Sequence, residues 1–214
     1  MKLEDNTDNC EINECRRCGI CCKKGGPSLH KEDKYLLEQG KLLLKYIYTI
    51  RKGEPVFENV KGIITTALSD LIKIKSEKNS STCIFYNEKI GCSIYNIRPI
   101  ECKALKCWDT LEIEKIYSKD RLERKDVLKP MKDIWELVND HQNKCSYEKL
   151  NEFFKAGRNN KQFFKNEFTI ELNSEINDMI NYDKNLREVI SLRLEKWADK
   201  LDFLLGRPMS VVIK

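Results

Sequence analysis

Four of the chain's ten cysteines fall within eight residues, at Cys15, Cys18, Cys21 and Cys22. Their spacing is CxxCxxCC, and Gly19 follows the second cysteine directly. Two residues between cysteines let a tight turn direct both sulfur atoms at one centre, and thiolates are ligands of zinc and of iron–sulfur clusters. The spacing therefore predicts a metal-holding loop near the start of the chain.

A second group of cysteines lies further along the chain, with long and irregular separations that do not match paired CxxC zinc knuckles: Cys83, Cys92, Cys102 and Cys107. We interpret the two groups as halves of one metal-binding core that offers eight thiolates in all. Neighbouring side chains diverge, so Cys21 and Cys22 suit a larger cluster or two adjacent centres better than one small tetrahedral ion. All-thiolate ligation fits zinc or an iron–sulfur cluster. The adjacent cysteines and the irregular second group favour an iron–sulfur cluster.

The remaining chemical residues are expected to have structural roles. We predict that Cys10 and Cys145 are small buried residues or free thiols. His30 and His141 are predicted to be surface or capping residues. Tyr95 and Arg98 are predicted to brace the cysteine loop. The sequence contains no Ser/His/Asp set, no phosphate-cradling loop and no HExxH motif. It therefore assigns no catalytic residue and leaves open whether the protein is an enzyme.

Composition restricts the class of protein. Of the 214 residues, 34% are charged and 41% are hydrophobic, which is typical of a soluble, largely helical chain. Its 39 basic and 34 acidic residues are interspersed without a long basic block, so nucleic-acid binding is not indicated. The beginning, MKLEDNTDNC, lacks the apolar stretch of a signal peptide, and the run LLLKYIYTI is too short to span a membrane. We therefore expect a cytoplasmic protein, where thiols stay reduced and bind metals.

Hydrophobic periodicity predicts helices over 28–51 and from Asn59 to Ile74, followed by a short hairpin or irregular β segment over 83–95. Further helices are predicted after Pro130 and after Ser146, then a strand over 168–172 and a long helix from about 174 or 184 to 205. The tail is predicted to pair as a strand or dock on the core. The expected fold class is mostly α with a small irregular α+β cysteine-rich metal-binding core. We divide the chain into a cysteine-cluster metal-binding region, residues 1–110, and a helical region, residues 111–214, that packs on it.

The cysteine motifs resemble those of the YkgJ-type cysteine-cluster family, whose signature is CxxCxxCC. The resemblance covers roughly the first half of the chain, and it rests on Cys15, Cys18, Gly19, Cys21, Cys22, Cys83 and the run GCSIYNIRPIEC, which carries Gly91, Cys92, Tyr95, Arg98, Pro99 and Cys102. Cys107 follows where the family often has one more cysteine. Members are described as zinc- or iron-chelating domains or as Fe–S-cluster proteins, so the resemblance implies metal or cluster binding without a settled reaction.

Three functions follow as hypotheses. In the first, an iron–sulfur cluster serves a redox, electron-transfer or maturation step together with a protein partner. In the second, the metal is structural zinc, and the helical half binds a partner protein. The third, a minor alternative, is a protein lysine N-methylase, because a related cysteine pattern appears in bacterial methylases that act on flagellin; the chain shows no glycine-rich methyl-donor loop in its support.

Overall fold

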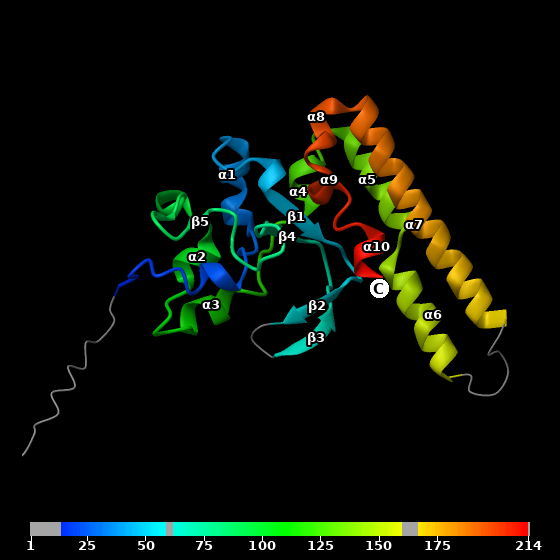
Figure 1. Ribbon diagram of the computed structural model, residues 1–214, viewed down its shortest axis with the longest axis horizontal. Coiled ribbons are helices and arrows are strands. Elements are labelled where there is room, and N and C mark those ends of the chain that lie inside the picture. The colour runs from blue at the N-terminus through cyan, green and yellow to red at the C-terminus, as the bar shows by residue number, and fades with distance from the viewer. Residues whose placement is uncertain (1–13, 59–61, 160–166, 214) are drawn as a thin grey trace, which may run out of the picture.

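The computed structural model describes residues 14–58, 62–159 and 167–213 and has an α+β fold (Figure 1). Small antiparallel pairings lie at its centre, and a long helical hairpin extends to one side. The helices of the first part are α1 (Lys34–Glu38), α2 (Ile100–Ala104), α3 (Leu111–Ile116) and α4 (Arg124–Leu128). Those that follow are α5 (Lys132–Lys144), α6 (Tyr147–Asn159), α7 (Glu167–Arg193), α8 (Glu195–Ala198), α9 (Leu201–Leu204) and α10 (Met209–Val212). None of the described helices is both long and apolar enough to cross a membrane.

Residues 47–58 and 62–74 form a long two-stranded ribbon. Strand β1 (Ile47–Ile50) pairs antiparallel with β4 (Leu71–Ile74), and β2 (Pro55–Glu58) pairs with β3 (Ile63–Thr66). The Gly53 N–H donates to the Ala67 carbonyl at 2.9 Å, and the Ala67 N–H donates to Glu54 at 3.0 Å, which joins the two pairings. The helices predicted over 28–51 and from Asn59 to Ile74 are therefore wrong, apart from the short α1; residues 59–61 lie outside the described residues. Runs of β-branched and aromatic side chains, such as YIYTI and IITT, favour the strands instead.

The ribbon is widened by two short extended segments. The Leu29 N–H donates to the Ile72 carbonyl at 2.8 Å, and the Leu122 N–H donates to the Leu29 carbonyl at 2.9 Å. Segment 28–30 therefore lies between β4 and segment 120–122, with β-bridges from Ser28 to Lys73 and from His30 to Arg121. Because side chains alternate along extended backbone, Leu29 and its neighbours in the adjacent strands face the hydrophobic core, and the bridged residues face the opposite side.

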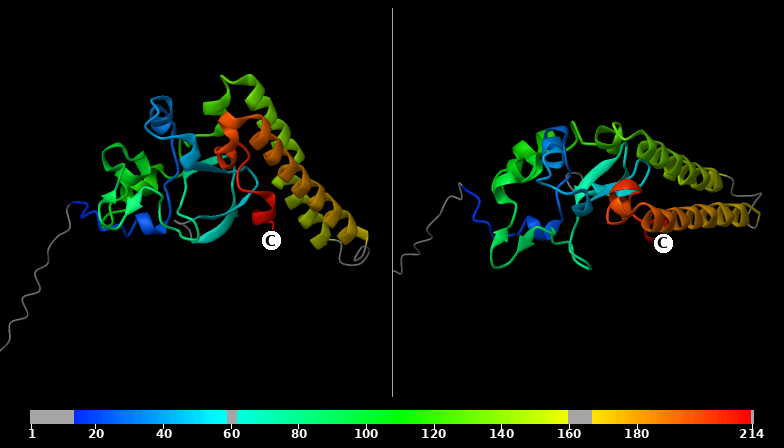
Figure 2. Two further views of the ribbon diagram at one scale, coloured as in Figure 1. Left: turned by 45° about the horizontal axis from the view of Figure 1, so that its top comes forward. Right: turned by 90° about the horizontal axis from the view of Figure 1, so that it is seen from above.

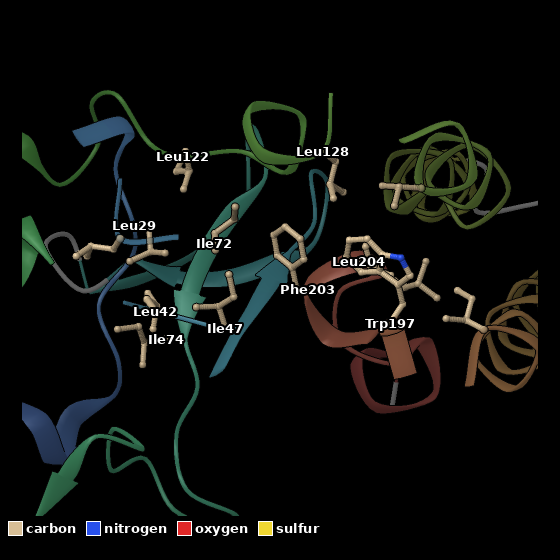
Figure 3. Close-up of a cluster of buried hydrophobic side chains, with 14 of the residues drawn as sticks. Leu29, Leu42, Ile47, Ile72, Ile74, Leu122, Leu128, Trp197, Phe203 and Leu204 are labelled. Carbon is tan, nitrogen blue, oxygen red and sulfur yellow. The ribbon is translucent and has the colours of Figure 1, made fainter. Parts of the chain in front are cut away.

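One hydrophobic core draws on both halves of the sequence. Figure 3 shows Ile47 and Ile72 of the ribbon facing Phe203 and Trp197 from the last segment of the chain. The same cluster includes Cys83 from the second cysteine run and Ile190 of α7. Burial of such large apolar side chains stabilises a protein by about 1.5–3 kcal/mol each, so the C-terminal segment is an integral part of the fold.

The helical hairpin consists of α5 and α6 in line, with α7 running back alongside them (Figure 2). The Ser146 hydroxyl accepts a hydrogen bond from the Lys149 N–H at 3.3 Å, which confirms the predicted helix start there. The strand predicted over 168–172 is wrong, because α7 already begins at Glu167. Leu172, Ile176 and Ile180 recur at helical spacing instead and pack against a second core cluster: Cys145, Tyr147, Leu150, Met179 and Met209.

The end of the chain is a series of short helices. α7 stops at Arg193, and Leu194 has φ −125° and ψ 61°, so the single helix predicted to run to residue 205 is interrupted. Of the five apolar residues that suggested it, Ile190, Trp197 and Leu204 are buried, Leu201 is partly buried and Leu194 is exposed. The predicted tail, SVVI at residues 210–213, lies in and just after α10, and its Val212 and Ile213 pack against the second core cluster, which is one of the two placements predicted for it.

His141 is buried in the hairpin, contrary to its predicted surface position. Its Nε2 lies 2.9 Å from Asp183 Oδ1, and the side chain is fully shielded from solvent. Burial lowers the pKa of His141 to about 4. Burial alone would raise the pKa of Asp183, but hydrogen bonds from His141 and Arg187 bring it down to about 2. At neutral pH the pair is therefore a neutral imidazole beside a carboxylate.

We expect this histidine to make the protein acid-sensitive. In the unfolded chain His141 has its ordinary pKa near 6.5. Between pH 6.5 and 4, His141 therefore binds a proton in the unfolded chain but stays neutral in the folded chain. Stability should fall as pH falls through this window, by roughly 3 kcal/mol for a shift of this size. Urea unfolding at several pH values should show a smaller loss in His141→Gln, which keeps an N–H for Asp183. An equal slope in the two proteins would contradict the assignment.

Candidate metal centre

The CxxCxxCC loop closes over the ring of Tyr86. Gly19 has φ +78°, and a Cβ atom placed on it would lie 2.0 Å from the Tyr86 ring carbon Cζ. Only glycine fits a position with this conformation and this close approach. The Tyr86 hydroxyl donates to the Cys18 carbonyl at 3.3 Å, and the Lys23 N–H donates to the Gly19 carbonyl at 2.9 Å, where the helix η1 (Cys22–Lys24) begins. These contacts fix the path of the loop.

The second cysteine run forms the predicted hairpin and then a short helix. Strand β5 (Tyr86–Asn87) pairs with β6 (Gly91–Cys92), which places Cys92 opposite Tyr86. This pairing confirms the hairpin predicted over 83–95. After the 3₁₀ helix η4 (Tyr95–Ile97) and the Arg98–Pro99 turn, α2 begins and carries Cys102. The hairpin and α2 thus present their cysteines from different backbone elements.

Contacts between backbone and side chains hold the two cysteine runs together. The Cys83 N–H donates to the Cys22 carbonyl at 2.8 Å, and the Ser81 hydroxyl donates to the Lys23 carbonyl at 2.6 Å. The guanidinium carbons of Arg17 and Arg98, one from each run, lie 4.0 Å and 3.9 Å from the Tyr95 ring centroid. Cation–π contacts of this kind contribute about 0.5–2 kcal/mol. Tyr95 and Arg98 therefore brace the junction, as the sequence predicted.

Five thiols from the two runs lie close enough to affect one another's ionisation: Cys21, Cys22, Cys83, Cys92 and Cys102. Burial raises the pKa of Cys22 to about 12, and the neighbouring sulfurs of Cys21, Cys92 and Cys83 add to the rise. Burial also raises the pKa of Cys102 well above its usual value, again with contributions from its cysteine neighbours. The more buried thiols of this group, Cys22, Cys83 and Cys102, therefore resist ionisation unless positive charge is added.

The other predicted ligands lie at the outside of this group. Cys15, Cys18 and Cys107 are exposed, as is Cys21, whereas Cys22, Cys92 and Cys102 are partly buried and Cys83 is buried. All the cysteines of the described residues are free thiols. Cys10 lies outside the described residues. Cys145 is buried in the second core cluster, where its Sγ donates to the Met179 carbonyl at 3.4 Å, so it has the small buried role expected for it.

The donor chemistry of this group suits a soft cation. Within residues 14–58, 62–159 and 167–213, no three His, Cys, Asp or Glu side chains are arranged as a finished metal-ion site. Rotation about a cysteine's Cα–Cβ bond moves its sulfur between staggered positions, and metal binding requires the thiolate form. A cation that replaces the thiol protons would offset the mutual repulsion of the sulfurs. The sulfur-rich donor set fits zinc or an iron–sulfur cluster better than calcium or magnesium.

A buried carboxylate, Asp33, and a partly buried one, Glu101, anchor α2 beside the loop, and sequence reasoning missed them. Glu101 accepts from the Ser28 N–H at 2.6 Å with Oε2, and its Oε1 lies 3.1 Å from Nε2 of His30. Asp33 accepts from the Ile100 N–H at 2.9 Å and from the His30 N–H at 2.9 Å. His30 is consequently buried and not at the surface. The acidic residue three positions after His30 was the one local signal, because this spacing is typical of a capping box.

A model of a protein family matches residues 14–121 and is described as "CxxCxxCC: Putative zinc- or iron-chelating domain". The matched segment contains both cysteine runs and ends within the extended segment 120–122 of the sheet. It therefore covers the thiol group, its bracing contacts and the α2 anchor. Searches of curated proteins and of solved structures gave no match.

Proposed function

Because the chain belongs to the CxxCxxCC family, we propose that its clustered thiolates hold an iron–sulfur cluster that serves a redox, electron-transfer or maturation step. The observation that carries this proposal is the grouping of five thiols from two distant cysteine runs. Cysteine ligation of iron–sulfur clusters commonly uses four thiolates. The family match supports metal chelation, and the sulfur-only group supports the cluster.

We assign the primary ligands to the four thiols of the group that are shielded from solvent: Cys22, Cys83, Cys92 and Cys102. They come from η1, the start of the hairpin, β6 and α2, so the metal would connect four separate elements. The exposed Cys15, Cys18, Cys21 and Cys107 remain candidates for a second centre or for ligand exchange at the surface.

The protein's own residues prepare this site. Gly19 and Tyr86 hold the loop in place, and the Cys83 N–H to Cys22 carbonyl hydrogen bond sets the spacing of two ligands. Arg17 and Arg98 stack on Tyr95 and thereby hold the two ligand-bearing runs against each other. When bound, an iron–sulfur cluster supplies one-electron redox chemistry. Partial burial of the ligands limits solvent access and thereby tunes the potential.

The second candidate function is structural zinc, with the helical half as a binding surface for a partner protein. It is favoured by exposed apolar side chains on α7, where Ile170 is 68% and Leu192 is 73% exposed. Zinc bound by four cysteines stabilises a fold without redox chemistry. The two candidates therefore share the ligands and differ in the metal and in the site of partner contact.

Metal analysis separates the two candidates. The full chain should be purified without oxygen, its visible absorption recorded, and its iron, acid-labile sulfide and zinc measured. We expect a brown protein with iron and sulfide in comparable amounts. A colourless protein with stoichiometric zinc would contradict the cluster and support structural zinc. Protein that holds neither metal, even after reconstitution with iron and sulfide or with zinc, would contradict both.

A further inference from the structure

The sheet has a polar face that lies against the cysteine-bearing helix α2. The β-bridges pair Ser28 with Lys73 and His30 with Arg121. Directly paired residues of antiparallel strands share a face, and so do residues two apart along a strand. These four residues therefore lie on one face, opposite the side that packs into the core. Glu101 of α2 contacts this face through Ser28 and His30.

Two positively charged groups converge on one hydroxyl at this face. Lys73 Nζ donates to Ser28 Oγ at 3.4 Å, and Arg121 Nη1 donates to the same oxygen at 3.4 Å. Ser28 is only 4% exposed, and its N–H donates to Glu101 at 2.6 Å, so the backbone that carries the hydroxyl is fixed. Lys73 and Arg121 are partly exposed residues on the same face.

Neither cation forms an ion pair with a carboxylate of the described residues, although the more distant charge of Glu101 raises the pKa of both. No carboxylate oxygen of residues 14–58, 62–159 and 167–213 is recorded within 4.0 Å of their nitrogens, whereas buried Arg124 forms an ion pair with Asp70. Both oxygens of Glu101 are already engaged by Ser28 and His30. Burial lowers the pKa of Lys73; the charge of Glu101 opposes this only in part, and the adjacent Arg121 adds to the lowering. A partly buried pair of like charges is costly unless an anion compensates it.

We propose that Lys73, Arg121 and Ser28 form a binding site for an oxyanion, the carboxylate or phosphate group of a small molecule, beside the metal centre. An ammonium, a guanidinium and a hydroxyl supply separate hydrogen-bond donors, and the two charged donors make the stronger bonds. The site adjoins the centre because Glu101, which contacts Ser28, directly precedes Cys102. Its position next to a metal rests on the proposed function; its affinity for an oxyanion does not.

The location of this site indicates what the centre acts on. A small molecule held by its acidic group at the polar face would extend toward α2 and its cysteine. Cys102 is close enough to Lys73 to influence its ionisation. The anion site would thus orient a carboxylate- or phosphate-bearing ligand at the metal centre. If the cations serve only to offset thiolate charge, the unaltered protein should bind no anion, and removal of the cations should change its metal content.

Calorimetry of the full, anaerobically purified chain tests the proposal. Inorganic phosphate and acetate should be titrated separately at constant ionic strength, so that general screening by salt does not change. We expect saturable binding of at least one of them, weakened about tenfold or more by Lys73→Met or Arg121→Gln, because each removes a charge-assisted hydrogen bond. The exposed Lys196→Met and Arg193→Gln remove the same charges elsewhere and should stay within about twofold of the unaltered protein.

A milder variant separates loss of anion binding from loss of folding. Ser28→Ala removes only the hydroxyl and should weaken binding by a smaller factor, with the circular dichroism spectrum unchanged. The site is contradicted if neither anion gives saturable heat, or if the control variants lose as much binding as the site variants. Metal content is measured on every sample. Metal-loaded protein that binds no anion contradicts this site alone, and anion binding by protein that takes up no metal contradicts the metal centre alone.

Discussion

Replacing Cys22 by serine is expected to remove most of the bound metal, whereas Cys145→Ser should leave the metal content unchanged. Cys22 belongs to the shielded group of thiols, and its carbonyl also holds Cys83 in place. A serine hydroxyl at that point is a hard, neutral oxygen that binds zinc or iron–sulfur clusters poorly. Cys145 lies in the second core cluster with its sulfur hydrogen-bonded to a backbone carbonyl.

The measurement is metal per chain after anaerobic purification and exhaustive dialysis, with circular dichroism to confirm that both variants fold. The loss in Cys22→Ser should be at least about tenfold, since even outer-shell changes around metals cost 10–100-fold in affinity. Cys18→Ser provides an intermediate test, because Cys18 is a predicted ligand that the structure leaves exposed. Equal losses in the Cys22 and Cys145 variants would contradict the assignment of ligands.

The largest expected effect on stability comes from Arg124→Met. Arg124 is 2% exposed and donates to both oxygens of Asp70, at 2.6 Å and 3.1 Å, and to the Leu204 carbonyl at 2.7 Å. The side chain thus ties the ribbon to α9 through the interior. Removing one partner leaves the Asp70 carboxylate in a site with little access to water. We expect the free energy of unfolding to fall by about 3–5 kcal/mol, as is typical when a buried ion pair is broken.

Urea unfolding at pH 7 gives this free energy, and two comparisons make the result specific. Lys144→Met removes a cation from an exposed pair with Asp140 one helical turn away and should have little effect. The double variant Arg124→Met with Asp70→Asn should recover part of the loss, because the stranded charge is gone. If Arg124→Met destabilises the protein no more than Lys144→Met, the buried pair does not hold the fold together.

The sequence predicted the parts of the fold that local patterns determine. The hairpin over 83–95 follows from two apolar pieces around NEKIG, and the start of α6 follows from Ser146. The ribbon was missed because Leu36, Leu43 and Ile47 also fit a helical spacing, which hid the alternation of YIYTI. Pairing with a strand more than twenty residues away decides between the two structures, as the register of Ile47 with Ile74 shows.

For the candidate site, the sequence predicted the cysteines but not their surroundings. The CxxCxxCC spacing and the GCSIYNIRPIEC run are local patterns, and they predicted both the loop and the hairpin. His30 and Glu101 are 71 residues apart, and His141 and Asp183 are 42 apart. No local pattern predicts such partners, so both histidines were expected to be surface or capping residues. His30 is at the N-cap of the 3₁₀ helix η2 (Lys31–Asp33), but it is buried. Long-range hydrogen bonding, and not the character of the imidazole, buries them.

The hydrophobic core shared by the ribbon and α7 has a practical consequence for measuring occupancy of the centre. Cys83 and Ile190 belong to the same cluster, so a ligand that tightens the cysteine half also resists the melting of the distant helices. Any molecule that binds only the native chain raises its unfolding temperature, and the rise grows with the logarithm of the ligand concentration relative to its dissociation constant. Thermal unfolding followed by far-ultraviolet ellipticity, to which the long α5, α6 and α7 contribute most, should therefore report metal binding without relying on the colour of the protein.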